Sequence, residues 1–323
     1  MRTEPALHTS RRRTAWAGAL FALAAVATGC GSDDPSTSAG TGSSESSGST
    51  GDTPVVSVTY SILGDVVQRL VGDDAVVQVV IPNGQDPHEF SPSARDVESM
   101  RDAELIVANG LGLEEGLADA LDEAADDGVP VFHVTDHVTL RALDPDDPEF
   151  DDHQGKDPHV WTDPLLMKEM APALVDQLEQ VLGVQLDDRL AAFEADMDSL
   201  DGQVRQILSA LPAGDCRLVT GHESLGYFAE RYGCEVIGAV IPSLSSTAEA
   251  SAKDLADLAR AAEDAGVAAI FTEVGTPAQV AEQVADEVGV PLVELPSHKL
   301  PDTGGYDAFV TDLATGIANA LAG

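Results

Sequence analysis

Two copies of the tripeptide Asp-Pro-His occur in this chain of 323 residues. The first copy ends at His88, after the apolar run 76–81, and the second ends at His159. Proline fixes its own φ and biases the residue before it toward extended backbone, so the chain leading to each histidine is stiffened. A third histidine, His222, follows the apolar run 217–221. These histidines lie where strands are expected to end, and ligand sites of α/β folds gather there.

Three such imidazoles indicate a metal site. Neutral imidazoles bind Zn²⁺ and other borderline first-row ions, and a carboxylate or a water completes the tetrahedron. A single histidine is more often structural, but two identical tripeptides and a third strand end reverse that expectation. The catalytic alternative is a zinc hydrolase, in which an open position holds a water of lowered pKa and Glu223 or Glu273 acts as base. Against it, the chain contains no H-E-x-x-H motif.

The elements that would position these histidines follow an alternating pattern. From Val55 onward, short apolar runs alternate with segments of helical periodicity, which is typical of a parallel sheet covered by helices. We therefore predict an α/β fold with two lobes, each built on a four-stranded parallel sheet. The expected strands are 55–59, 76–81, 105–109 and 131–134 in the first lobe, and 218–220, 236–240, 268–272 and 291–295 in the second.

Two long helices are expected between the lobes, over 165–182 and 186–211. The second carries one apolar stripe at three- and four-residue steps, and its roughly 26 residues would span about 39 Å. We expect this rigid helix to join the lobes and to limit their closure. The predicted organisation is a signal peptide (1–29), a lipidated tether (30–53), a first lobe (54–185), the linker helix (186–211) and a second lobe (212–323).

The N-terminus has the features of an export signal. Arg11 to Arg13 precede an apolar run from Ala15 to Ala27, which is shorter than the roughly 20 residues of a spanning helix. The run ends in Ala-Thr-Gly-Cys, so we expect a lipobox and a lipid on Cys30. A plain signal peptide or a membrane helix is the alternative, and both Sec and twin-arginine export stay open. Ser, Gly and Thr dominate residues 31–53, which predicts a flexible tether at the outer face of the membrane.

Cys216 and Cys234 each precede a strand-like run. In an oxidising compartment we expect them to form a disulfide between neighbouring strand starts. Ligation of a metal by their thiolates is the alternative, although their spacing is not C-x-x-C.

The chain is strongly acidic, with a net charge of −39. This charge argues against nucleic acid as a partner. Most of it is expected to solvate helix faces. The acidic segment 144–153 is either a cation-collecting loop or an ordinary solvated loop.

Three motifs together resemble one family. DPHEFSPSARD (86–96), DPHVW (157–161) and TGHESLGYFAERYG (220–233) are similar, in type and order, to motifs of the solute-binding lipoproteins of zinc and manganese ABC importers. The resemblance implies two α/β lobes bridged by a long helix, with the metal in the cleft between them. It implies His88, His159 and His222 as ligands. Manganese members tend to carry glutamate at the third position, so His222 rather than Glu223 there favours Zn²⁺ over Mn²⁺.

The fourth ligand is where this sequence departs from the family pattern. The resemblance implies an Asp or Glu near the last strand, at a set distance before a Gly-x-x-Tyr-like element. Counting back from Tyr306 on that basis gives Glu294, while His298 and an open position filled by water are the alternatives. Glu273 resembles a carboxylate that would orient one of the histidines.

The resemblance implies a zinc-capture protein, not an enzyme, and its partners would be an ABC metal permease and its ATPase. We expect a monomer, and a second role in cell adhesion is compatible with the sequence. The competing class is a binding protein of the same architecture for iron chelates or cobalamin, which the low aromatic content of 4% disfavours.

Overall fold

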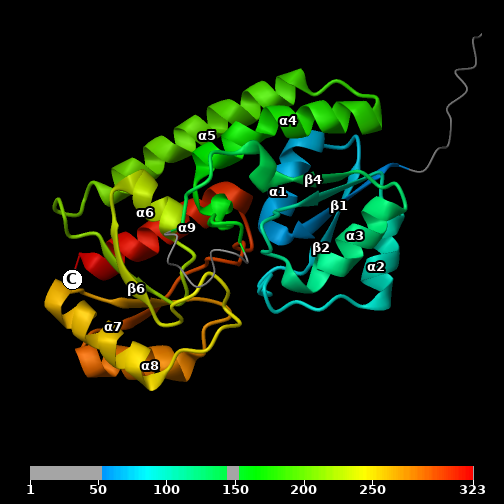
Figure 1. Ribbon diagram of the computed structural model, residues 1–323. Helices are drawn as coiled ribbons and strands as arrows, with labels where there is room; N and C mark the ends of the chain where they lie inside the picture. The colour runs from blue at the N-terminus through cyan, green and yellow to red at the C-terminus, as the bar shows by residue number, and fades with distance from the viewer. Residues whose placement is uncertain (1–52, 144–152, 323) are drawn as a thin grey trace, which may run out of the picture. The chain divides into compact units, whose positions relative to one another are not determined.

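The first half of the protein is built on a four-stranded parallel sheet in the order β2-β1-β3-β4. The computed structural model describes residues 53–143 and 153–322. The strands are β1 (Val55–Tyr60), β2 (Val76–Ile81), β3 (Leu105–Ala108) and β4 (Val131–His133). The two central strands, β1 and β3, are almost wholly buried, as the inner strands of a parallel sheet covered by helices should be. The α-helices that flank this sheet in the described residues are α1 (Ser61–Val71), α2 (Ala94–Arg101) and α3 (Ala118–Asp126). Helix α1 packs on β1 and β2, and α2 packs on α3 (Figure 1).

The second half contains the four predicted strands, but they form two parallel pairs. They are β5 (Arg217–Thr220), β6 (Glu235–Ala239), β7 (Ile270–Thr272) and β8 (Leu292–Glu294). Hydrogen bonds join β5 to β6 and β7 to β8, while β5 and β7 lie in contact without a shared ladder. The strands are only three to five residues long, and the β5–β6 register shifts between Leu218 and Val219. The predicted α/β class is therefore confirmed, whereas the continuous second sheet is not formed.

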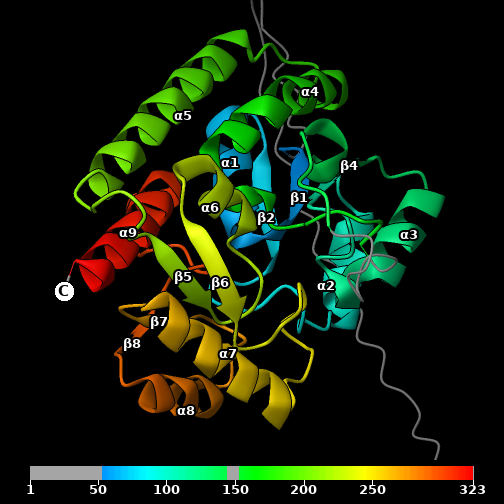
Figure 2. The same cartoon turned by 60° about the vertical axis from the view of Figure 1, so that its left-hand side comes forward.

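Three helices belong to this half: α6 (Gly226–Tyr232), α7 (Ala252–Ala265) and α8 (Ala278–Val288). Helices α7 and α8 pack against each other beside the strands (Figures 1 and 2). Helix α7 begins with a capping box, in which the Ser251 side chain accepts from Asp254 N and the Asp254 side chain accepts in return from Ser251 N.

Two long helices and the C-terminal helix connect the halves. They are α4 (Pro164–Leu182), α5 (Asp187–Leu208) and α9 (Gly305–Leu321). The side chain of Asp163 caps α4, Pro164 takes its first position, and Gly183 ends it in the left-handed conformation at φ 69°. Helix α5 ends at Leu208, three residues before the predicted end. It contacts α1 in the first half and α6 and α9 in the second (Figure 1).

One hydrophobic core runs through both halves. It includes Val58 and Leu63 of the first sheet and its helix, Phe193 of α5, and Phe228 and Phe309 of the second half. A smaller core lies between the β5–β8 strands and helices α7 and α8. Residues 51–323 accordingly form one compact unit by their contacts. No helix among the described residues is long and apolar enough to cross a membrane.

Cys216 and Cys234 are joined by a disulfide, as predicted. Their Cα atoms are 4.6 Å apart at the starts of β5 and β6. The predicted leader, the predicted lipid acceptor Cys30 and residues 144–152 of the acidic loop lie outside the described residues.

Candidate metal centre

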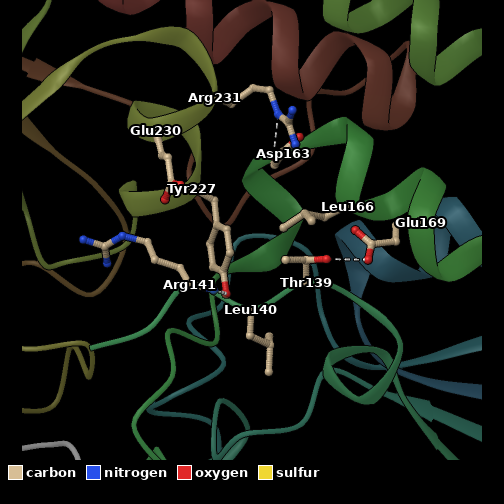
Figure 3. Close-up of a pocket in the computed structure, with 9 residues that line it drawn as sticks. All are labelled: Thr139, Leu140, Arg141, Asp163, Leu166, Glu169, Tyr227, Glu230 and Arg231. Atoms are coloured by element: carbon tan, nitrogen blue, oxygen red, sulfur yellow. Dashed lines mark hydrogen bonds and ion pairs between the residues drawn. The ribbon is translucent and has the colours of Figure 1, made fainter. Parts of the chain in front are cut away.

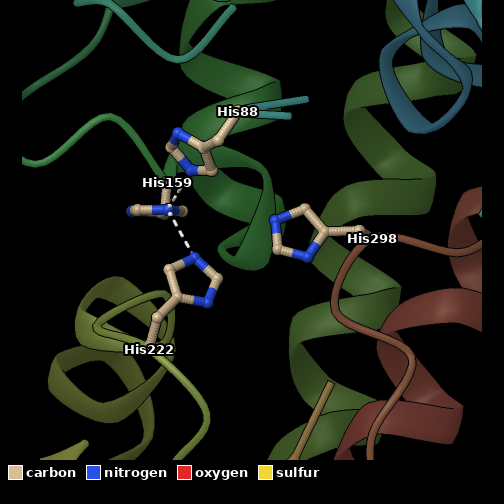
Figure 4. Close-up of side chains that lie close together, drawn as sticks. All are labelled: His88, His159, His222 and His298. Atoms are coloured by element: carbon tan, nitrogen blue, oxygen red, sulfur yellow. Dashed lines mark hydrogen bonds between the residues drawn. The ribbon is translucent and has the colours of Figure 1, made fainter. Parts of the chain in front are cut away.

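Four histidines converge on one point (Figure 4). His88, His159, His222 and His298 each offer a ring nitrogen, and these nitrogens all lie within 4.8 Å of one another. The Nε2 atom of His159 is 3.4 Å from that of His88 and 3.2 Å from that of His222. A tetrahedral Zn²⁺ with Zn–N bonds of about 2.05 Å separates its nitrogens by about 3.3 Å. The two separations from His159 therefore match those in a tetrahedral metal site, and all four side chains are buried.

The repeated tripeptide has a local structural meaning. The backbone N–H of His88 donates to Asp86 Oδ1 at 3.0 Å, and that of His159 donates to Asp157 Oδ1 at 2.9 Å. Each aspartate thus closes the same turn across its proline, which sends the following imidazole in a defined direction. Asn109 holds the second turn by donating from its side chain to Pro158 O at 2.8 Å.

Carboxylates lie directly behind two of the imidazoles, those of His159 and His222. Oδ1 of Asp157 lies 2.9 Å from His159 Nδ1, and Oε1 of Glu273 lies 2.6 Å from His222 Nδ1. Glu273 therefore lies against a ring nitrogen of His222. A carboxylate near Nδ1 retains the proton there and leaves the Nε2 lone pair free for a metal.

The other two imidazoles have weaker or neutral neighbours. Oε1 of Glu115 lies 3.6 Å from His88 Nδ1. His298 instead has the Ser297 hydroxyl 2.9 Å from Nδ1, and its Nε2 has no hydrogen-bond partner among the described residues. This buried, unpaired nitrogen faces the other three rings (Figure 4).

Burial sets the protonation of the cluster. It lowers the pKa of His159, and the electrostatic effect of the neighbouring His222 lowers that pKa further. Burial also lowers the pKa of His298 to about 4. For His222 burial acts in the same direction, but the carboxylate of Glu273 outweighs it and raises the pKa. Although burial opposes it, His222 in turn lowers the pKa of Glu273 and keeps it ionised. Two of the imidazoles are therefore held neutral, the form that binds metal.

Glu294, the first choice for fourth ligand, is not in this cluster. It is the exposed last residue of β8, and His298 occupies the remaining side of the site. After β8, Leu295 N donates to Thr272 O at 2.8 Å, and Trp161 Nε1 donates to Ser297 O at 2.9 Å. These bonds turn the chain inward. His298, four residues after Glu294, therefore reaches the other three histidines. His153 of the acidic segment has its Nδ1 2.8 Å from Leu111 O and also lies outside the cluster.

Two groups near the site were not anticipated from the sequence. Glu115 begins a short 3₁₀ turn, and its Oε1 also accepts from Ser245 Oγ of the second lobe at 2.6 Å. No sequence pattern marks either residue. The roles of Asp86 and Asp157 did have a signal, because an aspartate precedes each histidine by two positions.

The protein consists of parallel strands covered by helices, and two histidines from loops of each lobe meet at one buried point. These features define a metal-binding α/β protein. The comparisons specify the class further. Residues 56–320 match the family model of the zinc-uptake complex component A, periplasmic. The chain belongs to this family of solute-binding proteins, and the resemblance in its motifs is confirmed.

Individual relatives agree with this assignment. The chain is 31% identical to the zinc-binding protein TroA of Treponema pallidum over 238 residues, which is 73% of this chain and 75% of that protein. It is 26% identical to the manganese-binding lipoprotein MntA of Halalkalibacterium halodurans, over 84% of this chain and 85% of that one. The solved structure of the periplasmic zinc-binding protein TroA from Treponema pallidum superposes with a TM-score of 0.74 at 29% identity, covering 83% of this chain and 99% of that one.

Proposed function

We propose that this protein captures Zn²⁺ outside the cytoplasmic membrane and delivers it to an ABC-type permease and its ATPase. The observation that carries the proposal is the buried set of four imidazoles. In this assignment His88, His159, His222 and His298 are the ligands, and His298 takes the role first given to Glu294. The carboxylates of Asp157, Glu273 and Glu115 stabilise the charge of the bound ion from behind the rings.

The donor set favours Zn²⁺ over Mn²⁺. Four nitrogen donors at tetrahedral spacing suit a borderline ion such as Zn²⁺, whereas Mn²⁺ prefers carboxylate, carbonyl and water oxygens. Glu223, which would supply such an oxygen in a manganese-type site, is not among the grouped ligand atoms of the described residues.

The same geometry disfavours the two alternative functions. An iron chelate or cobalamin needs a cavity for a whole organic molecule, but these nitrogens lie within 4.8 Å of one another. A zinc hydrolase needs an open coordination position for a reactive water. Four imidazoles complete the tetrahedron and leave no such position.

Anchoring would place this site close to its permease. A lipid on Cys30 and the Ser/Gly-rich tether would hold the monomeric binding domain at the outer face of the membrane. The tether would let it reach a neighbouring permease without fixing its orientation. Metabolic labelling with a fatty acid, compared between the wild type and Cys30→Ala, tests the anchor, and equal labelling of the two would exclude it.

Competitive titration of the purified protein against chelators, with Zn²⁺ and with Mn²⁺, tests the ion. We expect one tightly bound Zn²⁺ per chain and much weaker Mn²⁺. A preference for Mn²⁺, or no bound metal at all, would contradict the proposal.

The matched pair His298→Ala and Glu294→Ala tests the fourth ligand. Loss of a direct ligand should weaken Zn²⁺ binding by more than the roughly 10- to 100-fold cost of losing an outer-shell partner. We therefore expect His298→Ala to lose more Zn²⁺ affinity than that range, and Glu294→Ala to keep the affinity of the wild type. The reverse order would return Glu294 to the site.

A further inference from the structure

The hydroxyl of Tyr227 joins helix α6 of the second lobe to the first-lobe segment that carries His159. It donates to the backbone oxygen of Asp157 at 2.7 Å and accepts from the backbone N–H of Arg141 at 3.0 Å. Asp157 N also donates to Arg141 O at 3.1 Å. The tyrosine therefore pins the point at which these two backbone segments pair.

Asp157 in turn holds the ligand. Its Oδ1 accepts from both the backbone N–H and Nδ1 of His159, each at 2.9 Å, and its Oδ2 pairs with the Arg141 guanidinium at 3.2 Å. Asp157 and His159 are fully buried, so no bulk water replaces these contacts. Asp157 thus links the Tyr227 hydroxyl to His159, a proposed metal ligand. Its backbone oxygen contacts the tyrosine and its carboxylate contacts the histidine, so a displacement of the tyrosine affects the position of the histidine.

Helix α6 can approach this pair because it begins with glycine. A Cβ at Gly226 would collide with the Asp157 carboxylate and the Arg141 guanidinium. His222 lies only four residues before Gly226, so one short stretch of the second lobe carries one histidine and braces another. Near the C-terminal end of α6, Arg231 forms an ion pair with Asp163, with Nε 2.7 Å from Oδ2.

The brace can be reached from the surface. Arg141, Tyr227, Asp163 and Arg231 line a groove of about 430 Å³ (Figure 3). In this view the Tyr227 ring stands between Arg141 and Leu166, with its hydroxyl directed toward the Arg141 segment. A shift of α6 relative to the first lobe would withdraw the hydroxyl from Asp157 O and Arg141 N.

We propose that Tyr227 is a positioning residue that couples retention of Zn²⁺ by His159 to the docking of the second lobe. The inference rests on the proposed zinc-binding function. While α6 is docked, Asp157 is held and His159 keeps its orientation. When the lobes move apart, Asp157 O and Arg141 N lose their shared partner, His159 loosens, and the ion leaves faster.

The test compares Tyr227→Phe with Tyr232→Phe, each of which removes only a hydroxyl from α6. The Tyr232 hydroxyl is buried and has no hydrogen-bond partner among the described residues, so it is a matched control. Release of Zn²⁺ into excess chelator and association of Zn²⁺ are measured by stopped flow. We expect Tyr227→Phe to release the ion about tenfold faster, at the lower end of the effects of outer-shell partners. Its association rate should be unchanged, and Tyr232→Phe should behave as the wild type.

A second measurement separates positioning from general destabilisation. In the metal-free protein, Tyr227→Phe should shift the imidazole NMR signals of His159 while leaving those of His298 in place. Equal release rates in Tyr227→Phe and the wild type would overturn the inference, and so would equal acceleration in both variants, which would indicate a packing effect. A wild-type protein that retains no Zn²⁺ would instead overturn the proposed function.

Discussion

At the scale of single residues, the metal centre depends on the groups behind the imidazoles. Asp157 and Glu273 direct the Nδ1 protons of His159 and His222 away from the cluster, so the Nε2 lone pairs face one another. Lone pairs gathered in this way repel each other in the metal-free protein, and a cation relieves the repulsion. Burial adds to the effect, because it disfavours the protons that would otherwise occupy these nitrogens.

Binding should therefore weaken as the pH falls. Glu273 raises the pKa of His222, so His222 is the first of the proposed ligands with shifted pKa values to gain a proton that competes with Zn²⁺. Burial lowers the pKa values of His159 and His298, so these rings compete only at lower pH. We expect the Zn²⁺ affinity to fall through the imidazole range, measured by chelator competition between about pH 8 and pH 5.

Glu273→Gln checks the cause of this pH dependence. Removing the carboxylate removes what raises the pKa of His222, so the affinity should begin to fall at a lower pH than in the wild type. A Zn²⁺ affinity of the wild type that is flat between about pH 8 and pH 5 would exclude histidine ligation.

At the scale of elements, the histidine-bearing loops of the second lobe follow short strands and therefore need other constraints. Strand β5 has four residues and β7 and β8 have three each, so their ladders contribute few hydrogen bonds. The disulfide between Cys216 and Cys234 closes the segment that contains β5, His222 and α6. It restricts the unfolded chain and keeps the two ends of this segment together.

The double variant Cys216→Ser/Cys234→Ser should be less stable by about 3 kcal/mol, the value for closing a loop of this size. Urea unfolding of the metal-free protein under non-reducing conditions measures the difference. Reduced wild-type protein serves as the control and should show a similar loss. Unchanged stability would mean that the bond adds no constraint beyond the packing of β5 and β6.

At the scale of the whole molecule, the shared core should make the two lobes unfold together. Helices α5 and α9 contribute to the same core as the first sheet, so separating the lobes exposes apolar surface on both sides. Trp161 is buried with its ring 5.2 Å from that of His159, so its fluorescence reports on the site. Circular dichroism reports on the helices. We expect both signals to change at the same urea concentration. Separate transitions would mean that the lobes are independent.

Shortening a buried side chain of α9 tests the same core. Phe309 is fully buried, and Phe309→Ala should cost about 3–5 kcal/mol in the free energy of unfolding. Val236→Ala, at a position that is 39% exposed, is the control and should stay within about 0.5 kcal/mol of the wild type. A small effect of Phe309→Ala would contradict a core that extends through the C-terminal helix.

The sequence by itself determined the features that depend on local pattern. Apolar runs and helical periodicity predicted the eight strands, because burial of one face imposes that spacing on each element separately. Asp-Pro-His predicted two candidate ligands, since the turn that orients each histidine is closed within the tripeptide. His222 was found in the same way, at the end of an apolar run.

Only the tertiary structure decided what depends on distant segments. Glu294 and His298 were both candidates for the fourth ligand. His298 is the one that lies beside the other three histidines, and Trp161 holds its neighbour Ser297 by a hydrogen bond from a distant segment. Glu115 and Ser245 meet across the lobes and leave no trace in the local sequence. The pairing of the second lobe's strands likewise depends on how β5 and β7 pack, since a strand's pattern indicates that it is buried but does not specify its neighbour.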